Sequence, residues 1–319
     1  MSKYLFNHSI ASWSDWGRVF NSPNSFAPLC EHIFDREHLE YSRPEKLTPG
    51  TNAVFRIGSY VVKIYAPIES GIDCVSDMST ELFAERFARE HDVPTPRILA
   101  SGEVLDRYRF VYIVSEYIDG IDFDSYVHDH PEKKRGLAAS LRELTDRMNQ
   151  PVPDFNSVDI INDPERSRRW DCFTDSFRAD RRAYIDRLDT SARVFVHGDL
   201  NSDNILVDRD GNLRVIDFAD AVKAPKFYEQ ALIATELFKF DPDLISGYFG
   251  YIPPETLAQM IVDGLLIHDF GGDIVRQRIV PQSELESVDD LYTHILSRLE
   301  QPQLKQPQYI RRNCRQLPE

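Results

Sequence analysis

The sequence is poor in cysteine and contains no long apolar run. Its four cysteines, Cys30, Cys74, Cys172 and Cys314, form no Cys-x-x-Cys pair, which argues against a zinc site or a disulfide framework and is typical of a reducing compartment. No run approaches the roughly 18 apolar residues that a membrane span requires, and no N-terminal signal of basic and apolar residues is visible. We therefore expect a cytoplasmic protein.

Positive charge is also scarce. The chain has 37 Lys and Arg against 52 Asp and Glu, a formal net charge of −15. Because nucleic acids and anionic lipids are bound by basic patches, neither a nucleic acid nor a membrane is an expected partner. An acidic surface could attract a polycationic substrate, although acidic residues that only aid solubility explain the charge better. With 319 residues, 42% of them apolar, the chain can form two lobes.

The most informative stretch reads His197-Gly-Asp199-Leu-Asn-Ser-Asp-Asn204, with Val215-Ile-Asp217-Phe218 shortly after it. Apolar β-branched runs at 193–196, 205–207 and 213–216 predict three short strands, so the polar residues fall at strand ends. Phosphoryl transfer needs a carboxylate for the attacking hydroxyl and oxygen ligands for Mg²⁺. Asp199 suits the first task, and Asn204 and Asp217 suit the second. Turn and cap residues of an ordinary hairpin are the alternative interpretation.

The spacing Asp-x-x-x-x-Asn matches the catalytic loop of protein kinases, and Asp217-Phe218-Ala219 stands where they have Asp-Phe-Gly. Gly198 and Asn201 replace the Arg and Lys of protein kinases. The loop instead resembles that of the aminoglycoside phosphotransferases, which reads His-Gly-Asp-Leu-x-x-x-Asn. This resemblance implies that the first Asp takes the acceptor hydroxyl and that the Asn and second Asp bind magnesium. It also implies a structural role for His197, hydrogen-bonded to backbone near the metal-binding Asp.

The N-terminal part contains a candidate phosphate-binding lysine. Residues 54–57 and 60–65 alternate in the manner of a β-hairpin around a two-residue turn, and Lys63 stands among β-branched residues of the second arm. It is either a kinase-type lysine that reaches the α- and β-phosphates or an edge-strand lysine with its ammonium in solvent. A helix is predicted over residues 81–90, capped by residues 77–80. By resemblance, Glu81 would fix the lysine, with Glu85 as the fallback.

Two further segments are expected to contact the nucleotide. No Gly-x-Gly-x-x-Gly precedes the hairpin; by resemblance, Thr51 and Asn52 would line the phosphates, and an ordinary turn after Pro49 is the alternative. Residues 110–120 predict a buried strand that runs into a turn. If this is the hinge of a kinase-like enzyme, the adenine would bond to the carbonyl of Glu116 and the N–H of Ile118.

The C-terminal part is predicted to be mainly helical, with helices over 133–148, 163–188, 226–240 and 255–270. Leu137, Leu141, Leu144 and Met148 share one face of the first. Six acidic residues could contact an amine-bearing acceptor, although caps or surface positions explain each of them better: Asp220, Glu236, Asp241, Asp243, Asp263 and Asp269. Residues that line the acceptor cannot be assigned from the sequence.

Residues 14–32 and 264–270 look like parts of the hygromycin B phosphotransferases, and similarity to that subgroup spans most of residues 12–272. His268-Asp269 could touch substrate, but a packing His beside an exposed Asp is the expected arrangement. The last 45 or so residues, roughly 273 onward, resemble no known segment.

We therefore expect a two-lobed, kinase-like α+β fold, with residues 1–119 as an antiparallel β lobe with one key helix and residues 120–319 as a larger helical lobe. The predicted activity is Mg²⁺-dependent transfer of the γ-phosphate of ATP or GTP to a hydroxyl of a small molecule, an aminoglycoside of the hygromycin B kind first, which would inactivate the antibiotic. Choline, a sugar, a macrolide or another metabolite could replace this acceptor. Protein phosphorylation is disfavoured because no Ala-Pro-Glu segment follows Asp217. A nucleotide-binding pseudoenzyme that acts as an interaction module is the remaining alternative.

Overall fold

The computed structural model describes residues 4–48, 50–72 and 74–300. The chain divides into two compact units. Of the described residues, the first unit contains those up to Leu82 and Pro96–Asp119, and the second contains Phe83–Thr95 and residues 120–300. The division into residues 1–119 and 120–319 stays a prediction, and the structure departs from it at 83–95. This segment belongs to the second unit because its apolar side chains, Ala84, Phe87, Ala88 and Val93, are part of that unit's core.

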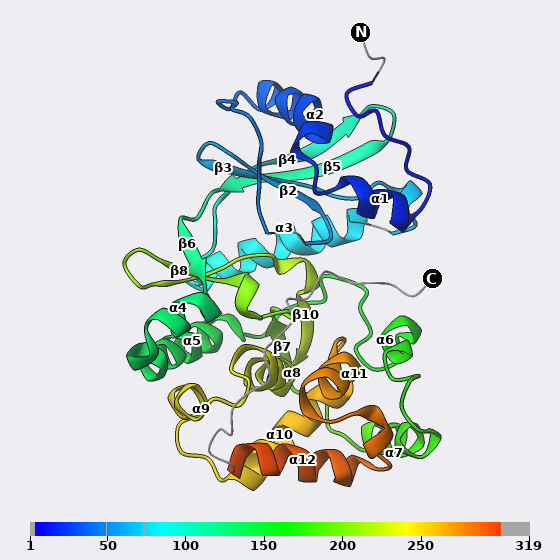
Figure 1. The fold of residues 1–319 in the computed structure, drawn as a ribbon, viewed down its shortest axis with the longest axis vertical. Coiled ribbons are helices and arrows are strands. Elements are labelled where there is room, and N and C mark those ends of the chain that lie inside the picture. The colour runs from blue at the N-terminus through cyan, green and yellow to red at the C-terminus, as the bar shows by residue number, and fades with distance from the viewer. Residues whose placement is uncertain (1–3, 49, 73, 301–319) are drawn as a thin grey trace. The chain divides into compact units, whose positions relative to one another are not determined.

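The first unit is built on an antiparallel sheet with strand order β1-β2-β3-β5-β4 (Figure 1). The strands are β1 (Glu45–Lys46), β2 (Ala53–Ile57), β3 (Tyr60–Ile64), β4 (Ile98–Leu105) and β5 (Arg109–Glu116). Ile57 pairs with Tyr60, so β2 and β3 form the predicted hairpin around a two-residue turn. The strand predicted from residue 110 is also confirmed, as β5, with a buried centre.

Aromatic side chains fill the core of the first unit. Helices α1 (Trp13–Val19) and α2 (Pro23–Arg36) precede the sheet. The ring of Phe26 lies 5.7 Å from that of Trp16 and 5.5 Å from that of Phe55, so α2 packs on both α1 and β2. The apolar residues Trp16, Phe20, Phe26 and Leu29 of segment 14–32 are therefore core residues.

Helix α3 (Cys74–Glu90) is longer than predicted. The sequence placed its cap at residues 77–80, but the structure has these residues inside the helix, with Asp77 in the first turn. This prediction was wrong because Asp and Ser favour the first turn nearly as much as the cap itself, so their presence does not fix the first residue.

The second unit is mainly helical and contains two small antiparallel sheets. Its helices are α4 (Phe123–Asp129), α5 (Lys134–Met148), α6 (Pro164–Arg168), α7 (Asp175–Ile185), α8 (Lys226–Leu232), α9 (Pro242–Phe249), α10 (Pro254–Ile267), α11 (Gly271–Ile274) and α12 (Val288–Glu300), with π-helical turns at Ile233–Leu237 and Val275–Ile279. Its strands are β6 (Gly120–Asp122), β7 (Arg193–Val196), β8 (Ile205–Asp208), β9 (Leu213–Val215) and β10 (Val222–Pro225). Strands β6, β8 and β9 form one sheet, and β7 and β10 form the other.

Two predicted helices differ in the structure. The helix expected over 163–188 is split into α6 and α7, because Thr174 caps α7 by accepting a hydrogen bond from the Phe177 N–H. The helix expected over 226–240 changes to a π-helical turn after Leu232. The other two expected helices match α5 and α10, and the predicted apolar face of α5 is buried.

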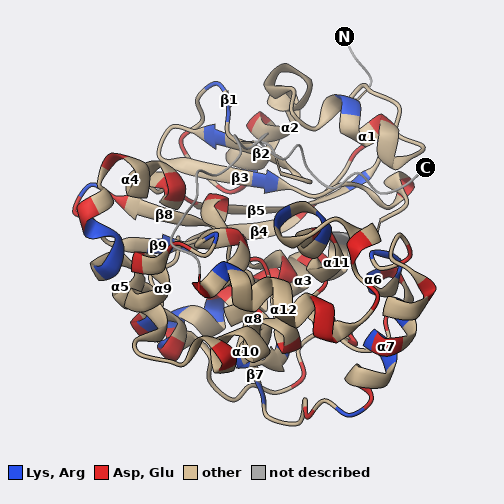
Figure 2. Ribbon diagram, turned by 60° about the horizontal axis from the view of Figure 1, so that its bottom comes forward, with Lys and Arg blue, Asp and Glu red and all other residues tan. Residues whose placement is uncertain are grey.

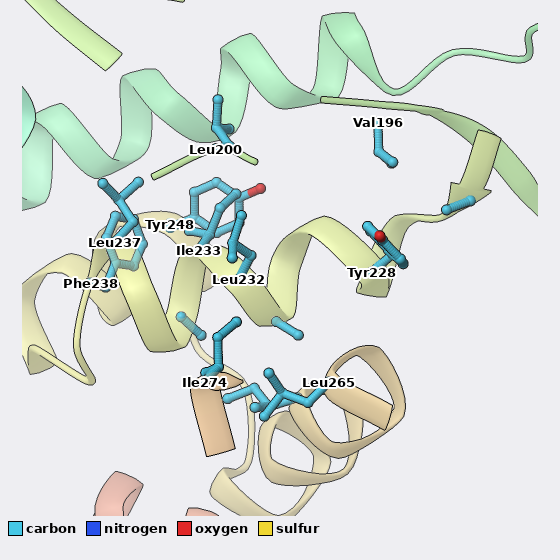
Figure 3. Packing of buried hydrophobic residues seen from close by; sticks show 14 of the residues in the cluster. Val196, Leu200, Tyr228, Leu232, Ile233, Leu237, Phe238, Tyr248, Leu265 and Ile274 are labelled. Carbon is cyan, nitrogen blue, oxygen red and sulfur yellow. The ribbon is translucent and has the colours of Figure 1, made fainter. Parts of the chain in front are cut away.

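The core of the second unit lies around α8 and α10, which pack on each other. Leu200 is fully buried and belongs to this cluster together with Leu232, Ile233 and Tyr248 (Figure 3). Leu200 lies between the two polar residues of greatest interest, Asp199 and Asn204. The loop that carries them is thus fixed to the core at its centre.

Helices α6 and α7 each carry both acidic and basic residues (Figure 2). Many of them form ion pairs within the helix, such as Arg168 with Glu165 and Arg182 with Asp186. Among the described residues, no helix is long and apolar enough to cross a membrane. Cys30 and Cys172 are free thiols, the first buried and the second exposed.

Candidate active site

The loop after β7 begins with His197, which is fully buried. Its Nδ1 accepts a hydrogen bond from the Asp199 N–H at 3.3 Å, so Nε2 carries the proton and donates to the Ile216 carbonyl at 3.0 Å. His197 therefore links the residue before Asp217 to the backbone of Asp199. This geometry confirms the expected structural role.

Only glycine fits at position 198. Its φ is +83°, and a Cβ placed there would lie 2.1 Å from the Asp220 carbonyl oxygen. Any side chain would therefore be strained in its backbone and would also push the loop away from the segment after β9.

Two amides hold the carboxylate of Asp199. Asn201 Nδ2 donates to Asp199 Oδ1 at 2.9 Å. Asn204 Nδ2 donates to the Asp199 carbonyl at 2.8 Å and to its Oδ2 at 3.2 Å. These two neutral amides orient the carboxylate. Its oxygens keep lone pairs that can accept a proton from a hydroxyl.

Asn204 and Asp217 lie on joined segments. The Ile216 N–H donates to the Asn204 carbonyl at 3.0 Å, which brings Asp217 next to the loop. Asp217 is exposed and has a φ of +61°, a left-handed conformation that is uncommon outside glycine and that clusters at functional sites. Among the described residues, no group of three or more His, Cys, Asp or Glu side chains could hold a metal. Mg²⁺ that is bound beside substrate phosphates often has only one or two protein ligands, however, and an amide oxygen and a carboxylate can provide them.

A buried carboxylate beneath the loop was not identified from the sequence. Glu229 of α8 accepts hydrogen bonds from the His197 N–H at 2.6 Å and from Asn149 Nδ2 at 2.9 Å. Asn149 also donates to the Phe195 carbonyl at 3.0 Å. Burial raises the pKa of Glu229 to about 7, although these donors oppose the shift. The sequence offered one indication of this buried carboxylate: Glu229 stands on the apolar face of a predicted helix, three residues before Leu232.

In the first unit, Lys63 is fixed by Glu81. Lys63 Nζ lies 2.6 Å from Glu81 Oε2, and both side chains are almost buried. The Tyr65 hydroxyl donates to the same carboxylate oxygen. Glu85, the fallback partner, pairs instead with Arg89. The expected Lys63–Glu81 ion pair is therefore present, while its role in nucleotide binding stays a prediction.

Thr51 and Asn52 immediately precede β2. The Thr51 carbonyl accepts a hydrogen bond from Trp16 Nε1 at 2.9 Å, and Asn52 is buried. Helix α1 thus anchors this segment, a contact between distant residues that the sequence did not indicate. The alternative, a turn after Pro49, begins at a residue outside the described part of the chain.

Glu116 and Ile118 stand at the end of β5. The Glu116 N–H donates to the Arg97 carbonyl at 3.0 Å, and its side chain pairs with Arg97 Nε at 3.1 Å. The Tyr117 N–H donates to the Ser59 carbonyl at 2.9 Å. Ile118 follows in an irregular segment and is half-buried. Hydrogen bonds thus fix the backbone of Glu116 and Tyr117, and adenine binding by Glu116 and Ile118 stays a prediction.

Most of the six acidic candidates for amine contacts already have basic or capping partners. Asp241 caps α9, and Asp243, Glu236 and Asp269 pair with arginines. Asp263 accepts from the Tyr184 hydroxyl. His268 is buried and stacks on Tyr228, as expected. The expected exposure of Asp269 was wrong: its side chain is 17% exposed because Arg169 covers it.

Comparison with known proteins identifies the fold and the family of the chain. No curated protein sequence matches the chain. The structure resembles those of aminoglycoside phosphotransferase APH(4)-Ia (TM-score 0.53, 17% identity, 85% of this chain and 98% of that chain) and of APH(2")-IIa with streptomycin and ATP (0.56, 16%, 85% and 96%). It also resembles that of aminoglycoside 2'-phosphotransferase-IIIa with GDP (0.57, 15%, 88% and 97%).

These likenesses confirm the predicted kinase-like α+β fold, with an antiparallel sheet in the N-terminal part and a larger helical part. The model of the phosphotransferase enzyme family matches residues 50–255, which include both the Lys63–Glu81 pair and the Asp199 loop. The chain is therefore a phosphotransferase and belongs to the phosphotransferase enzyme family.

Proposed function

We propose that this phosphotransferase transfers the γ-phosphate of ATP or GTP to a hydroxyl of a small molecule, with Asp199 as the residue that orients and deprotonates the hydroxyl. The observation that carries the proposal is the double anchoring of the Asp199 carboxylate by Asn201 and Asn204 beside Asp217. A fixed carboxylate within reach of the hydroxyl is what this reaction requires of a general base.

Mg²⁺ fits the residues beside this carboxylate. The amide nitrogen of Asn204 is engaged by Asp199, which leaves the amide oxygen as its metal-binding atom. Asp217 adds an exposed carboxylate. Bound by these oxygens, Mg²⁺ would neutralise charge on the transferred phosphate.

Lys63 is the proposed contact for the α- and β-phosphates. Its ion pair with Glu81 fixes the nearly buried ammonium on β3. Thr51 and Asn52 would contact the phosphates, and the backbone of Glu116 and Ile118 would contact the adenine or guanine. Positioning and electrostatic stabilisation then supply most of the rate.

An aminoglycoside, hygromycin B first, is the proposed acceptor. Three observations support it: the diffuse similarity to hygromycin B phosphotransferases, the fold shared with three aminoglycoside phosphotransferases, and the net charge of −15, which suits a polycation. Inactivation of the antibiotic would be the biological result.

The test is release of ADP or GDP from Mg·ATP or Mg·GTP with a panel of hygromycin B, other aminoglycosides, macrolides, choline and simple sugars. Asp199→Asn should lower kcat by about 10²- to 10⁴-fold and leave nucleotide affinity nearly unchanged. Asp210→Asn, which removes an exposed carboxylate from the β8–β9 turn, is the matched control and should keep full turnover.

Each outcome of the panel has a defined meaning. Turnover with hygromycin B that Asp199→Asn abolishes supports both the chemistry and the acceptor. Turnover with choline, a sugar or a macrolide keeps the chemistry and replaces the acceptor. Nucleotide binding without any turnover would favour a pseudoenzyme, and full activity of Asp199→Asn would overturn the assignment of the base.

A further inference from the structure

His268 is a buried residue with an unused hydrogen-bond donor. It follows the last residue of α10 and is 1% exposed. Its Nδ1 accepts a hydrogen bond from the Phe270 N–H at 3.1 Å. Its Nε2 has no hydrogen-bond partner among the described residues. Because a buried donor without an acceptor is costly, this atom requires an explanation.

The surroundings fix the imidazole in its neutral form and in one orientation. Burial lowers the pKa of His268 to about 3, and the nearby Arg166 guanidinium adds to the shift. With Nδ1 as an acceptor, the single proton of the neutral ring is on Nε2. The ring stacks on Tyr228, with centroids 4.2 Å apart, and Arg166 donates to the Tyr228 hydroxyl at 2.9 Å. The donor therefore has a defined direction.

The Gly198 carbonyl lies near the His268 ring, and Nε2 completes no hydrogen bond among the described residues. That carbonyl belongs to the peptide group that joins Gly198 to Asp199. The N–H of the same peptide group donates to His197 Nδ1 at 3.3 Å. Two histidines from distant parts of the chain thus face the two polar ends of one peptide group, immediately before Asp199.

We propose that His268 is a positioning residue, whose Nε2–H closes a hydrogen bond to the Gly198 carbonyl when Mg²⁺ and the nucleotide occupy the loop, and so fixes the orientation of Asp199. The inference rests on the proposed role of Asp199. Long or open hydrogen bonds in ligand-free enzymes commonly shorten once substrate is bound. A peptide plane held at both its N–H and its C=O cannot rotate, so the attached carboxylate keeps its direction.

A matched pair of substitutions separates the hydrogen bond from packing. His268→Gln keeps a donor near the position of Nε2, whereas His268→Met has a similar size and no donor. Both lose the Nδ1 acceptor, so that loss cancels in the comparison. We expect the Met variant to have a kcat about tenfold below that of the Gln variant, with equal KM for the nucleotide.

Proton NMR of protein with ¹⁵N-labelled histidine gives a readout that does not depend on turnover. The His268 Nε2 proton, assigned by its absence in the Gln variant, should move downfield and exchange more slowly when Mg²⁺ and a non-hydrolysable ATP analogue are added. The analogue alone, without Mg²⁺, should have a smaller effect, because the proposed metal ligands Asn204 and Asp217 flank the loop.

The results also separate this inference from the proposed function. If the Gln and Met variants have equal kcat, or if the Nε2 proton does not change while binding of the analogue is saturated, His268 only packs and the inference fails. If Asp199→Asn keeps full turnover, the proposed function fails whatever the His268 variants do.

Discussion

The two units hold their proposed reactive residues by different kinds of contact. In the first, Lys63 is held through its charged side chain by Glu81, with Tyr65 on the same carboxylate. In the second, the loop of Asp199 is held mainly through its backbone, by buried groups such as His197 and Glu229. A side-chain ion pair can weaken gradually when one partner changes, whereas a backbone anchored at several points tolerates little change. The two regions should therefore respond differently to substitution.

Among the substitutions that test this difference between the units, the largest expected effect comes from adding a methyl group to the backbone-anchored loop. Gly198→Ala forces a φ of +83° on alanine and places its Cβ 2.1 Å from the Asp220 carbonyl oxygen. We expect a stability loss of about 2–4 kcal/mol and a fall in kcat of about 100-fold. Urea unfolding and steady-state kinetics at saturating nucleotide measure the two.

Gly211→Ala is the matched control for this variant. Gly211 also has a φ of +83°, but the nearest atom to its Cβ position is the Tyr126 hydroxyl at 3.4 Å. Both variants share the backbone strain, so the difference between them reports the close approach to Asp220. Equal losses of activity in the two variants would show that the loop is not anchored as described.

Substitutions in the Lys63–Glu81 ion pair should have a smaller effect, which should be limited to KM for the nucleotide. Lys63→Met removes the proposed phosphate contact and should raise KM for the nucleotide by at least roughly tenfold. Glu81→Gln leaves the ammonium less firmly held, so its effect on KM should have the same direction and be smaller. Titration of each variant with Mg·ATP and Mg·GTP measures this. A change in kcat with KM unchanged would mean that the lysine does not bind ground-state nucleotide.

The sequence predicted the side-chain pair better than the backbone anchors. Resemblance to the aminoglycoside phosphotransferases named Glu81 as the partner of Lys63, with Glu85, one helical turn later, as the fallback, and the structure has the Glu81 pair. The strands around the Asp199 loop were predictable because β-branched runs and turn residues act locally. The Glu229 contact joins residues 32 positions apart through a backbone N–H. Every residue type except proline provides a backbone N–H, so no sequence pattern identifies this contact.

The pH dependence of stability should distinguish two buried groups that face the loop. The pKa of Glu229 is raised from 4.5 to about 7, so the folded protein binds the extra proton between these values and loses stability as pH rises. The pKa of His268 is lowered from 6.5 to about 3, so in that window the unfolded chain binds the extra proton and stability rises with pH. Between pH 4.5 and 6.5 the two contributions oppose each other.

Removing one group should therefore reveal the other. Relative to the wild type, the free energy of unfolding of Glu229→Gln should increase with pH from 4.5 to 6.5 by about 1.4 kcal/mol per unit. That of His268→Gln should decrease with pH by a similar amount. Urea unfolding at half-unit steps of pH measures both slopes, and slopes of the same sign in the two variants would contradict the assignment.

The smallest expected effect tests whether the second glutamate of α3 has any part in nucleotide binding. Glu85 lies one turn after Glu81 and pairs with Arg89, four residues further along the same helix. Such a pair contributes about 0.5 kcal/mol, and glutamine can still accept from the arginine, so Glu85→Gln should change stability by no more than this and should leave KM unchanged. A KM for Mg·ATP that rises as much in Glu85→Gln as in Glu81→Gln would mean that the lysine exchanges between the two carboxylates. Lys63 would then be held by the negative charge of the helix and not by one defined contact. The first unit could no longer be described as a region held by a single ion pair, in contrast to the backbone-anchored loop of the second unit.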